Sequence, residues 1–297
     1  MPNAKNRTKR PRLLPILLIA LAAVILLLGV SVLISRFLSY GAEATVSAKE
    51  DLPADSAQSE SADTQLQESA ADKNTYDPAC FHRDGGFIRY DSDDMTSQVG
   101  IDVSAHQQSI DWPSVAAAGV DFAILRVGYR GYTEGAIQED EYFSENLSGA
   151  IDAGLDVGVY FFSQAMDEQE AREEAQFVLD KIRGCSLSYP VFFDWETVEA
   201  DARSDAMDMT SLTTVTDTFC SVIEAAGYRA GLYFNQRFGY EELHLPSLTD
   251  YVFWLAEYND TPTFAYDFSL WQYTSSGSVD GIEGSVDLNL AFIPKAS

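Results

Sequence analysis

Short apolar runs alternate with amphipathic stretches from about residue 99 to the end of the chain. The apolar runs predict eight strands, at 99–104, 122–128, 156–162, 189–195, 229–234, 252–258, 268–274 and 286–292. Helix-like stretches follow the first four of them, at Trp112–Ala118, Glu141–Ala153, Asp167–Arg183 and Ser211–Ala226. Near-continuous apolar strands that alternate with helices are typical of a parallel sheet covered on both faces. The pattern therefore predicts an α/β domain over 99–297.

The order of these elements favours one of two α/β architectures. Five βα units are followed by three strands with little helix between them, which indicates a closed barrel smaller than a full (β/α)8 barrel of about 250 residues. An open, doubly wound sheet is the alternative. In the sequence no glycine-rich phosphate loop follows an early strand, so a nucleotide-binding fold has little support.

The first forty residues differ sharply from the rest. Leu13–Ser35 is a run of 23 residues without a charge, and as a helix it would span roughly 34 Å, enough to cross a hydrocarbon core of about 30 Å. The positive-inside rule makes residues 1–12, which are basic, a cytoplasmic tail and places the remainder outside. A cleaved signal peptide with a site at 42–44 is the alternative, but its apolar core is usually about 7–15 residues long. We therefore expect a single-pass protein of the cell membrane with an extracellular domain.

Two segments connect the apolar run to the predicted barrel. From Gly41 to about Asn74 the chain has no aromatic residue, and such a stretch cannot bury enough apolar surface to offset its ordering entropy. We predict a disordered acidic linker over 36–75. Residues 76–98 contain several large apolar side chains, so this segment could pack on the domain that follows.

Charge excludes one class of function. The 297 residues include 19 Lys+Arg and 46 Asp+Glu, for a net charge of −27. Beyond residue 40, 13 cations face all 46 acids, which is a net charge of −33. Such a body repels polyanions, so nucleic-acid binding through a basic face is effectively excluded. The 3 cysteines are too few for a disulfide scaffold, although Cys185 and Cys220 could pair in an extracellular domain.

Acidic residues occur at the predicted strand ends, where the chemistry of such barrels is found. Asp102 is near the end of the first strand, Asp194 and Glu196 end the fourth, and Asp287 begins the eighth. Asp194 and Glu196 point the same way, with Cα atoms roughly 6–7 Å apart. Burial and like charge should raise the pKa of one and leave the other ionised, as a glycosidase requires. In a closed barrel the first and last strands are neighbours, so Asp102 and Asp287 would lie beside this pair.

Two other interpretations account for the same acids. Asp194 and Glu196 alone could be a solvated strand end or a helix cap, and four carboxylates could hold Ca²⁺ or Mg²⁺. However, the sequence has no loop with EF-hand spacing, and its histidines are scattered without a zinc-binding pattern. We expect no metal and no cofactor. His106 lies just past Asp102, so lining the mouth is one interpretation of it, but we prefer a surface-loop residue.

Aromatic residues near the strand ends are suited to a sugar cleft, because flat rings stack on the apolar faces of pyranose rings. The predicted substrate contacts are Tyr129, Tyr160, Tyr233, Trp254 and Trp271, together with Glu257 near the end of the sixth strand. Core packing is the alternative for each ring, and we prefer it for Phe162.

The segment from about Val99 to Phe292 resembles glycoside hydrolase family 25, the Chalaropsis-type lysozymes (N-acetylmuramidases). The resemblance rests on seven motifs in order: GIDVS at 100–104, FAILRVGY at 122–129, AGLDVGVYFFS at 153–163, FDWE at 193–196, WLAEY at 254–258, WQY at 271–273 and VDLN at 286–289. It implies an irregular (β/α)5β3 TIM-like barrel without a cofactor, which in this chain would follow a transmembrane helix and a disordered linker.

The resemblance also implies a reaction. The substrate would be the glycan strands of peptidoglycan, cleaved at the β-1,4 bond between N-acetylmuramic acid and N-acetylglucosamine. Glu196 would be the general acid, Asp194 would assist the N-acetyl group of the substrate, and Asp102 and Asp287 would complete the acidic cleft. A catalytically silent wall-binding domain, a chitinase-like hydrolase and a membrane protein whose outer domain only contacts partners are the alternatives.

Overall fold

The computed structural model of the protein describes residues 71–198 and 201–295. The predicted membrane segment Leu13–Ser35 and most of the predicted linker lie outside the described residues. Within the described ranges, no helix is both long and apolar enough to cross a membrane.

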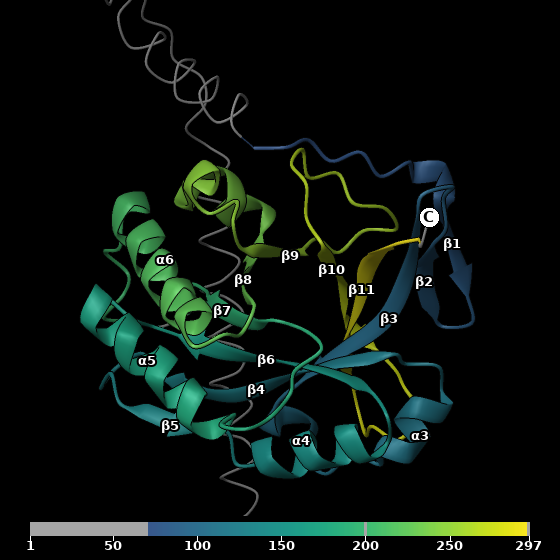
Figure 1. Ribbon diagram of the computed structural model, residues 1–297, viewed down its shortest axis with the longest axis horizontal. Coiled ribbons are helices and arrows are strands. Elements are labelled where there is room, and N and C mark those ends of the chain that lie inside the picture. The colour runs from purple at the N-terminus through teal and green to yellow at the C-terminus, as the bar shows by residue number, and fades with distance from the viewer. Residues whose placement is uncertain (1–70, 199–200, 296–297) are drawn as a thin grey trace, which may run out of the picture. The chain divides into compact units, whose positions relative to one another are not determined.

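Eight strands close into a barrel (Figure 1). They are β3 (Met95–Val103), β4 (Phe122–Arg130), β6 (Asp156–Ser163), β7 (Val191–Trp195), β8 (Ala230–Asn235), β9 (Val252–Ala256), β10 (Leu270–Gly277) and β11 (Val286–Pro294). Each strand pairs with the next along the chain, and the pairing of β11 with β3 closes the ring. The eight predicted strands are therefore present, and the open sheet is excluded.

One strand corrects the expectation of a parallel sheet. β11 runs antiparallel to both β10 and β3, whereas β9 and β10 are parallel, like the barrel pairs before them. Only residues 278–285 separate β10 from β11, and a parallel crossover needs about a dozen residues or more. Because β11 runs backwards, its first residues lie opposite the last residues of β3, so Asp287 is the register partner of Asp102.

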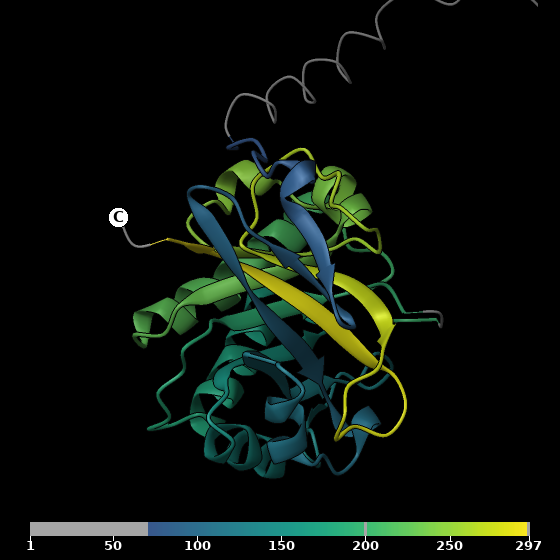
Figure 2. The same cartoon turned by 90° about the vertical axis from the view of Figure 1, so that its right-hand side faces the viewer.

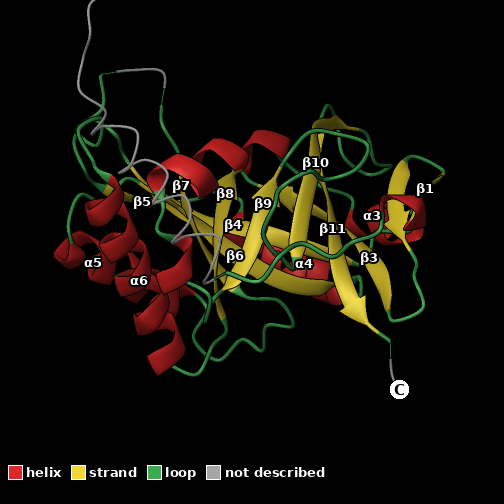
Figure 3. Ribbon diagram, turned by 90° about the horizontal axis from the view of Figure 1, so that it is seen from above, coloured by secondary structure: helices red, strands yellow, loops and turns green. Residues whose placement is uncertain are grey.

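Helices cover the early part of the barrel. They are α3 (Trp112–Ala117), α4 (Phe143–Asp152), α5 (Glu168–Lys181) and α6 (Met209–Ala225), close to the predicted ranges. The short strand β5 (Ile137–Glu139) pairs with the end of β4. A π-helical turn (Phe238–Glu242) and a 3-10 turn (Leu245–Ser247) follow β8. Figure 3 shows α5 and α6 on one side of the barrel and β1 on the other.

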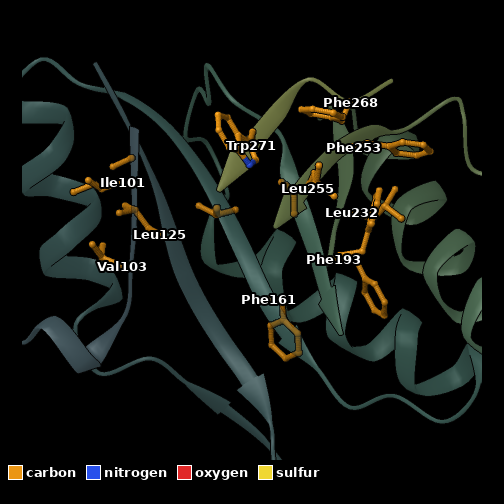
Figure 4. Packing of buried hydrophobic residues seen from close by; sticks show 14 of the residues in the cluster. Ile101, Val103, Leu125, Phe161, Phe193, Leu232, Phe253, Leu255, Phe268 and Trp271 are labelled. Carbon is orange, nitrogen blue, oxygen red and sulfur yellow. The ribbon is translucent and has the colours of Figure 1, made fainter. Parts of the chain in front are cut away.

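Alternation along the strands divides the core into two layers. Inside the barrel, Phe122, Phe192 and Trp254 belong to a small cluster, and a larger cluster packs outside the strands (Figure 4). The interior is narrow: a Cβ on Gly100 would lie 2.1 Å from the Phe122 ring, so only glycine fits there. Cys220 lies in the outer layer, and all three cysteines are free thiols, so Cys185 and Cys220 do not form a disulfide.

Residues 76–94 cover the side of the barrel formed by β3, β10 and β11. A 3-10 turn (Pro78–Cys80) leads into β1 (Phe81–Asp84), which pairs with β2 (Phe87–Tyr90) as an antiparallel hairpin. β2 lies against β3 and β11 (Figure 2). Tyr76 stacks on Phe292 with ring centroids 3.6 Å apart, and Phe81 meets Trp271 edge-on. The aromatic residues of this segment therefore pack on the barrel.

Two predicted boundaries are wrong. The first barrel strand begins at Met95 rather than at residue 99, because β3 pairs with β11 from Met95 to Asp102. The last five residues of the predicted linker, 71–75, are ordered. Lys73 pairs with Tyr266, and the backbone N–H of Asn74 donates to Ala265 O at 3.0 Å. Composition did not reveal this contact because it is made by the backbone.

Candidate active site

Four carboxylates meet inside the barrel at the carboxyl ends of the parallel strands. Asp102 lies near the end of β3, Asp194 is in β7, Glu196 directly follows β7, and Asp287 begins β11. Asp102 and Asp287 face each other across the β3–β11 ladder. The two pairs are close enough to interact: the charge of Asp102 raises the pKa of Asp194, and the charge of Asp287 raises the pKa of Glu196. The structure thus brings together the four acids that the strand-end pattern identified.

These acids form two hydrogen-bonded pairs, Asp194 with Glu196 and Asp102 with Asp287. Burial, followed by the charge of Glu196, raises the pKa of Asp194 well above its usual range, and burial also raises the pKa of Glu196. Burial and then the charge of Asp287 raise the pKa of Asp102. Each pair therefore keeps a proton at a pH where two isolated carboxyls would both be ionised.

One oxygen of this cluster has no protein partner. Asp194 is 5% exposed, and its Oδ1 atom is buried without a hydrogen bond from any described residue. A buried carboxylate oxygen without a donor costs free energy because it has lost its hydration. Asp194 Oδ1 is therefore suited to accept a hydrogen bond from a bound molecule.

Glu196 is more accessible than Asp194, and its backbone is held in place. The side chain is partly exposed just beyond the end of β7. Gln164, which is fully buried, donates from Nε2 to Glu196 O at 2.9 Å, and Ser204 Oγ donates to Gln164 Oε1. These contacts fix the direction in which the Glu196 side chain leaves the strand.

Two amide side chains hold Asp102. Gln272 Nε2 and Asn289 Nδ2 donate to Asp102 Oδ2 at 2.8 and 2.7 Å. Both hydrogen bonds lower the pKa of Asp102 and so oppose the effect of its burial. Neither amide was assigned a role from the sequence. The available signal was strand alternation, since Asn289 lies two residues after Asp287 and so faces the same way.

Three aromatic residues orient these amides. Trp254 Nε1 donates to Asn289 Oδ1 at 2.8 Å, and the hydroxyls of Tyr233 and Tyr258 donate to the Gln272 Oε1 atom at 3.0 Å. The predicted residues Trp254 and Tyr233 therefore lie at the site, but Trp254 is 1% exposed and acts through Asn289. Tyr258 was not predicted as a substrate contact, although it is 56% exposed and reaches the same network.

Tyr160 and Tyr129 occupy different depths of the mouth. Burial raises the pKa of Tyr160, which also feels the charges of Asp102 and Asp194, so its ring lies among the acids. Tyr129 is at the rim, where its hydroxyl donates to Gln138 Oε1 at 3.0 Å. The guanidinium of Arg126 lies over the Tyr129 ring, 5.3 Å from its centroid.

Arg126 is the cation that the sequence reasoning missed. Its charge lowers the pKa of Asp194, in opposition to burial and to the neighbouring acids. Arg126 Nε donates to Asp140 Oδ2 at 2.8 Å, and Asp140 is 2% exposed, so the guanidinium is held in place. Arg126 belongs to an apolar motif, so the sequence pattern did not single it out. Strand alternation was the available signal, because Arg126 lies two residues beyond the inward-facing Ile124.

Two predicted substrate contacts face elsewhere. Trp271 is fully buried in the outer layer, where its Nε1 donates to Glu257 O at 2.8 Å. The expectation that Trp271 faces the cleft is wrong, because alternation on β10 turns its neighbour Gln272 inward instead. The carboxylate of Glu257 accepts hydrogen bonds from Asn259 Nδ2, Thr263 N, Thr263 Oγ1 and Phe264 N, so it organises its own loop.

The mouth carries a histidine, and its acids are not arranged as a metal site. Burial raises the pKa of Asp287, and the hydrogen bond with Asp102 and the charge of the exposed His106 partly offset this. His106 is therefore at the surface, as expected, and it also lies near the acids of the mouth. Across residues 71–198 and 201–295, no group of three or more His, Cys, Asp or Glu side chains could hold a metal ion.

Comparison with known proteins identifies one family and several lysozymes. The family model described as glycosyl hydrolases family 25 matches residues 101–282. The chain is 28% identical over 191 residues to the autolytic lysozyme of Clostridium acetobutylicum, covering 64% of this chain and 54% of that protein. It is 29% identical over 210 residues to lysozyme M1 of Streptomyces globisporus, covering 66% and 68%.

Among solved structures, the chain is similar to an autolysin. The modular autolysin LytC from Streptococcus pneumoniae matches with a TM-score of 0.60 and 26% identity, covering 72% of this chain and 52% of that one. LytC has also been solved in complex with a synthetic peptidoglycan ligand. This chain therefore spans about half the length of both the clostridial lysozyme and LytC.

Proposed function

Because the chain belongs to glycosyl hydrolases family 25, we propose that it is a lysozyme that cleaves peptidoglycan between N-acetylmuramic acid and N-acetylglucosamine. The observation that carries the proposal is the hydrogen-bonded pair Asp194–Glu196 at the mouth of the barrel, with Asp102 and Asp287 beside it. The lysozyme names of two relatives and the peptidoglycan ligand of LytC support the choice of substrate.

Glu196 is the general acid in this proposal. A glycosidic oxygen leaves more easily when it is protonated, and the acid must still hold its proton near neutral pH. Burial raises the pKa of Glu196, and the hydrogen bond with Asp194 partly offsets this, so the proton that the pair keeps is available to Glu196. It is also the more exposed member of its pair, so it can reach the leaving oxygen. After the first step Glu196 has lost its proton, and it then takes one from the attacking water.

Asp194 assists the N-acetyl group of the substrate. Retaining enzymes with a carboxylate nucleophile place their two carboxyls about 5–5.5 Å apart, and inverting enzymes about 6.5–9.5 Å apart, on opposite faces of the sugar. Asp194 and Glu196 leave the chain on the same side and interact directly, so they do not lie on opposite faces of a bound sugar. The acetamido oxygen of the sugar therefore attacks the anomeric carbon. Asp194 Oδ1, which lacks a donor, accepts the acetamido N–H and balances the positive charge that develops there.

Two measurements test the reaction and its route. The full-length chain should solubilise bacterial peptidoglycan, and the Glu196→Gln variant should lose this activity by about 10²–10⁴-fold, the usual contribution of a general acid–base. NMR analysis of the first-formed product should show a retained anomeric configuration, because two successive inversions occur at the same carbon. A first product of inverted configuration would contradict the assisted route.

The expected membrane anchor is also part of the proposal. The uncharged run Leu13–Ser35 would hold the chain in the membrane, with residues 1–12 in the cytoplasm and the barrel outside, where peptidoglycan lies. The barrel should then be digested by protease added to wall-stripped cells, while an epitope tag at the N-terminus is protected. Release of the barrel into the medium by wild-type cells would favour the cleaved signal peptide.

A further inference from the structure

A hollow of about 630 Å³ lies at the barrel mouth, on the side covered by the β1–β2 hairpin. Its walls come from three parts of the chain: the hairpin, the loop that begins after β9, and the end of β10. The hairpin contributes Arg83 and Gly86 to the lining, the loop contributes Tyr258 and Asp260, and the strand contributes Ser276.

The hollow is joined to the carboxylates through Tyr258. Tyr258 lines the hollow, and its hydroxyl donates to Gln272, whose amide holds Asp102. The pKa of Tyr258 is raised, first by burial and also by the charge of Asp287, so the tyrosine borders both places. A glycan chain that leaves the carboxylates on this side would meet the exposed face of Tyr258 next.

The hairpin wall lies outside the part of the chain that the family model matches. That match begins at residue 101, whereas Arg83 and Gly86 belong to the hairpin at 81–90. The hairpin is fixed on the barrel by the edge contact of Phe81 with Trp271 and by the Ile88 N–H, which donates to the Tyr273 hydroxyl at 3.3 Å. The wall is therefore formed before any ligand binds.

An ion pair links the hairpin to the loop across the rim. Arg83 Nη2 donates to Asp260 Oδ1 at 2.6 Å, and the two side chains are 61% and 85% exposed. A pair this exposed contributes little to stability. Its remaining donors and acceptors are available to hydroxyl groups of a ligand. Asp260 also neutralises Arg83, and the protein is strongly acidic, so an anionic ligand is not favoured here.

We propose that this hollow is an additional subsite for a neutral N-acetylhexosamine residue of the glycan strand, beyond the two sugars at the cleaved bond. The inference rests on the proposed function for the identity of the strand. Tyr258 stacks on the sugar ring, and the Arg83–Asp260 pair and Ser276 bind its hydroxyls. The hairpin thereby lengthens the stretch of glycan that the enzyme recognises.

Binding to fragments of increasing length tests the subsite without any cleavage. Full-length protein in detergent, carrying Glu196→Gln, is titrated by calorimetry with glycan fragments of one, two and four disaccharide repeats. We expect at least one lengthening step to tighten binding by about tenfold, as one or two added hydrogen bonds with ring stacking would give. Adding Gly86→Trp should abolish this gain, because a Cβ at residue 86 meets nothing within 4 Å and the indole can fill the hollow.

A second bulky substitution provides the control. His82 is exposed on the same hairpin but does not line the hollow, so His82→Trp should keep the gain with length. Arg83→Ala removes a side chain that is 61% exposed, so it should fold normally and lose part of the gain. Equal length dependence in Gly86→Trp, Arg83→Ala and the parent protein would overturn the subsite, and so would a parent without length dependence.

The same proteins separate this inference from the proposed function. With Glu196 restored, kcat/KM should be higher for long glycans than for short ones. The ratio of the two values should fall in Gly86→Trp. Length-dependent binding without cleavage by the wild-type chain would contradict the proposed lysozyme activity and leave the subsite standing. If the wild-type chain cleaves and Gly86→Trp leaves the long-to-short ratio of kcat/KM unchanged, the subsite is overturned and the lysozyme activity stands.

Discussion

Replacing Asn289 by alanine tests whether the amide network sets the ionisation of Asp102. Asn289 is fully buried, and its Nδ2 donates to Asp102 Oδ2 at 2.7 Å. On its other side, Asn289 Oδ1 accepts the indole N–H of Trp254 at 2.8 Å. The substitution therefore removes a donor from a carboxylate and leaves a buried N–H without an acceptor.

The size of the effect follows from these two losses. A hydrogen bond to a charged group contributes about 1.5–3 kcal/mol, which corresponds to a rise of about 1–2 units in the pKa at which the Asp102–Asp287 pair first ionises. The Trp254 N–H, left without an acceptor, adds about 1–3 kcal/mol of destabilisation, so the free energy of unfolding should fall by roughly 2.5–6 kcal/mol in total.

Two assays separate these effects. The pH dependence of kcat/KM on solubilised peptidoglycan should show its acidic limb displaced upward by about 1–2 units in Asn289→Ala. Thermal unfolding should show the loss of stability. Trp254→Phe is the matched control, because it leaves the Asn289–Asp102 hydrogen bond in place: its stability should fall while its acidic limb stays within about half a unit of wild type. An unmoved acidic limb in Asn289→Ala, together with the expected loss of stability, would refute this role of the network.

Three further substitutions have distinct expected outcomes. Asp194→Asn should lower kcat by about 10²–10³-fold with little change in KM, because it removes one group that stabilises charge in the transition state. Steady-state kinetics would check this. The raised pKa values of the acids mean that the folded state binds their protons more tightly than the unfolded chain does. Their contribution to stability is therefore largest below about pH 4 and is lost as pH rises through the folded pKa values. Asp287→Asn removes one of these charges, so its melting temperature should exceed that of wild type at pH 8 but not at about pH 4. Glu257→Gln should lower the free energy of unfolding by about 1.5–3 kcal/mol, because an amide nitrogen would face backbone donors. KM should stay unchanged. A raised KM would instead support the substrate contact predicted from the sequence.

Much of the fold was predictable because its signals are local. The strands are short apolar runs, and the helices between them have an amphipathic period, so both can be recognised without tertiary information. The direction of β11 was not recognised. It depends on the short connection after β10, which permits only an antiparallel return. That reversal also explains why Asp287, at the start of its strand, lies with Asp102 near the end of another.

The acids were easier to predict than the residues around them. Asp102, Asp194, Glu196 and Asp287 are conspicuous because carboxylates beside apolar runs need a reason to be buried. Aromatic residues carry no such signal, since both faces of a barrel strand are covered and a ring such as Trp271 can pack on either.

The neutral and paired polar residues were missed for a different reason. The amide of Gln272 and the guanidinium of Arg126 become significant only when the partner that each one holds or faces is known. The hairpin wall depends equally on tertiary contacts, because Arg83 meets Asp260 across a separation of 177 residues. Neither sequence spacing nor composition contains this information.

The central claim is that Glu196 drives cleavage on the reducing side of N-acetylmuramic acid. The most direct measurement is mass spectrometry of the fragments released from bacterial peptidoglycan by the full-length chain, after borohydride reduction, with Glu196→Gln in parallel. We predict fragments that end in reduced N-acetylmuramic acid and that are lost in the variant. Fragments that end in reduced N-acetylglucosamine, or equal release by the variant, would contradict the claim.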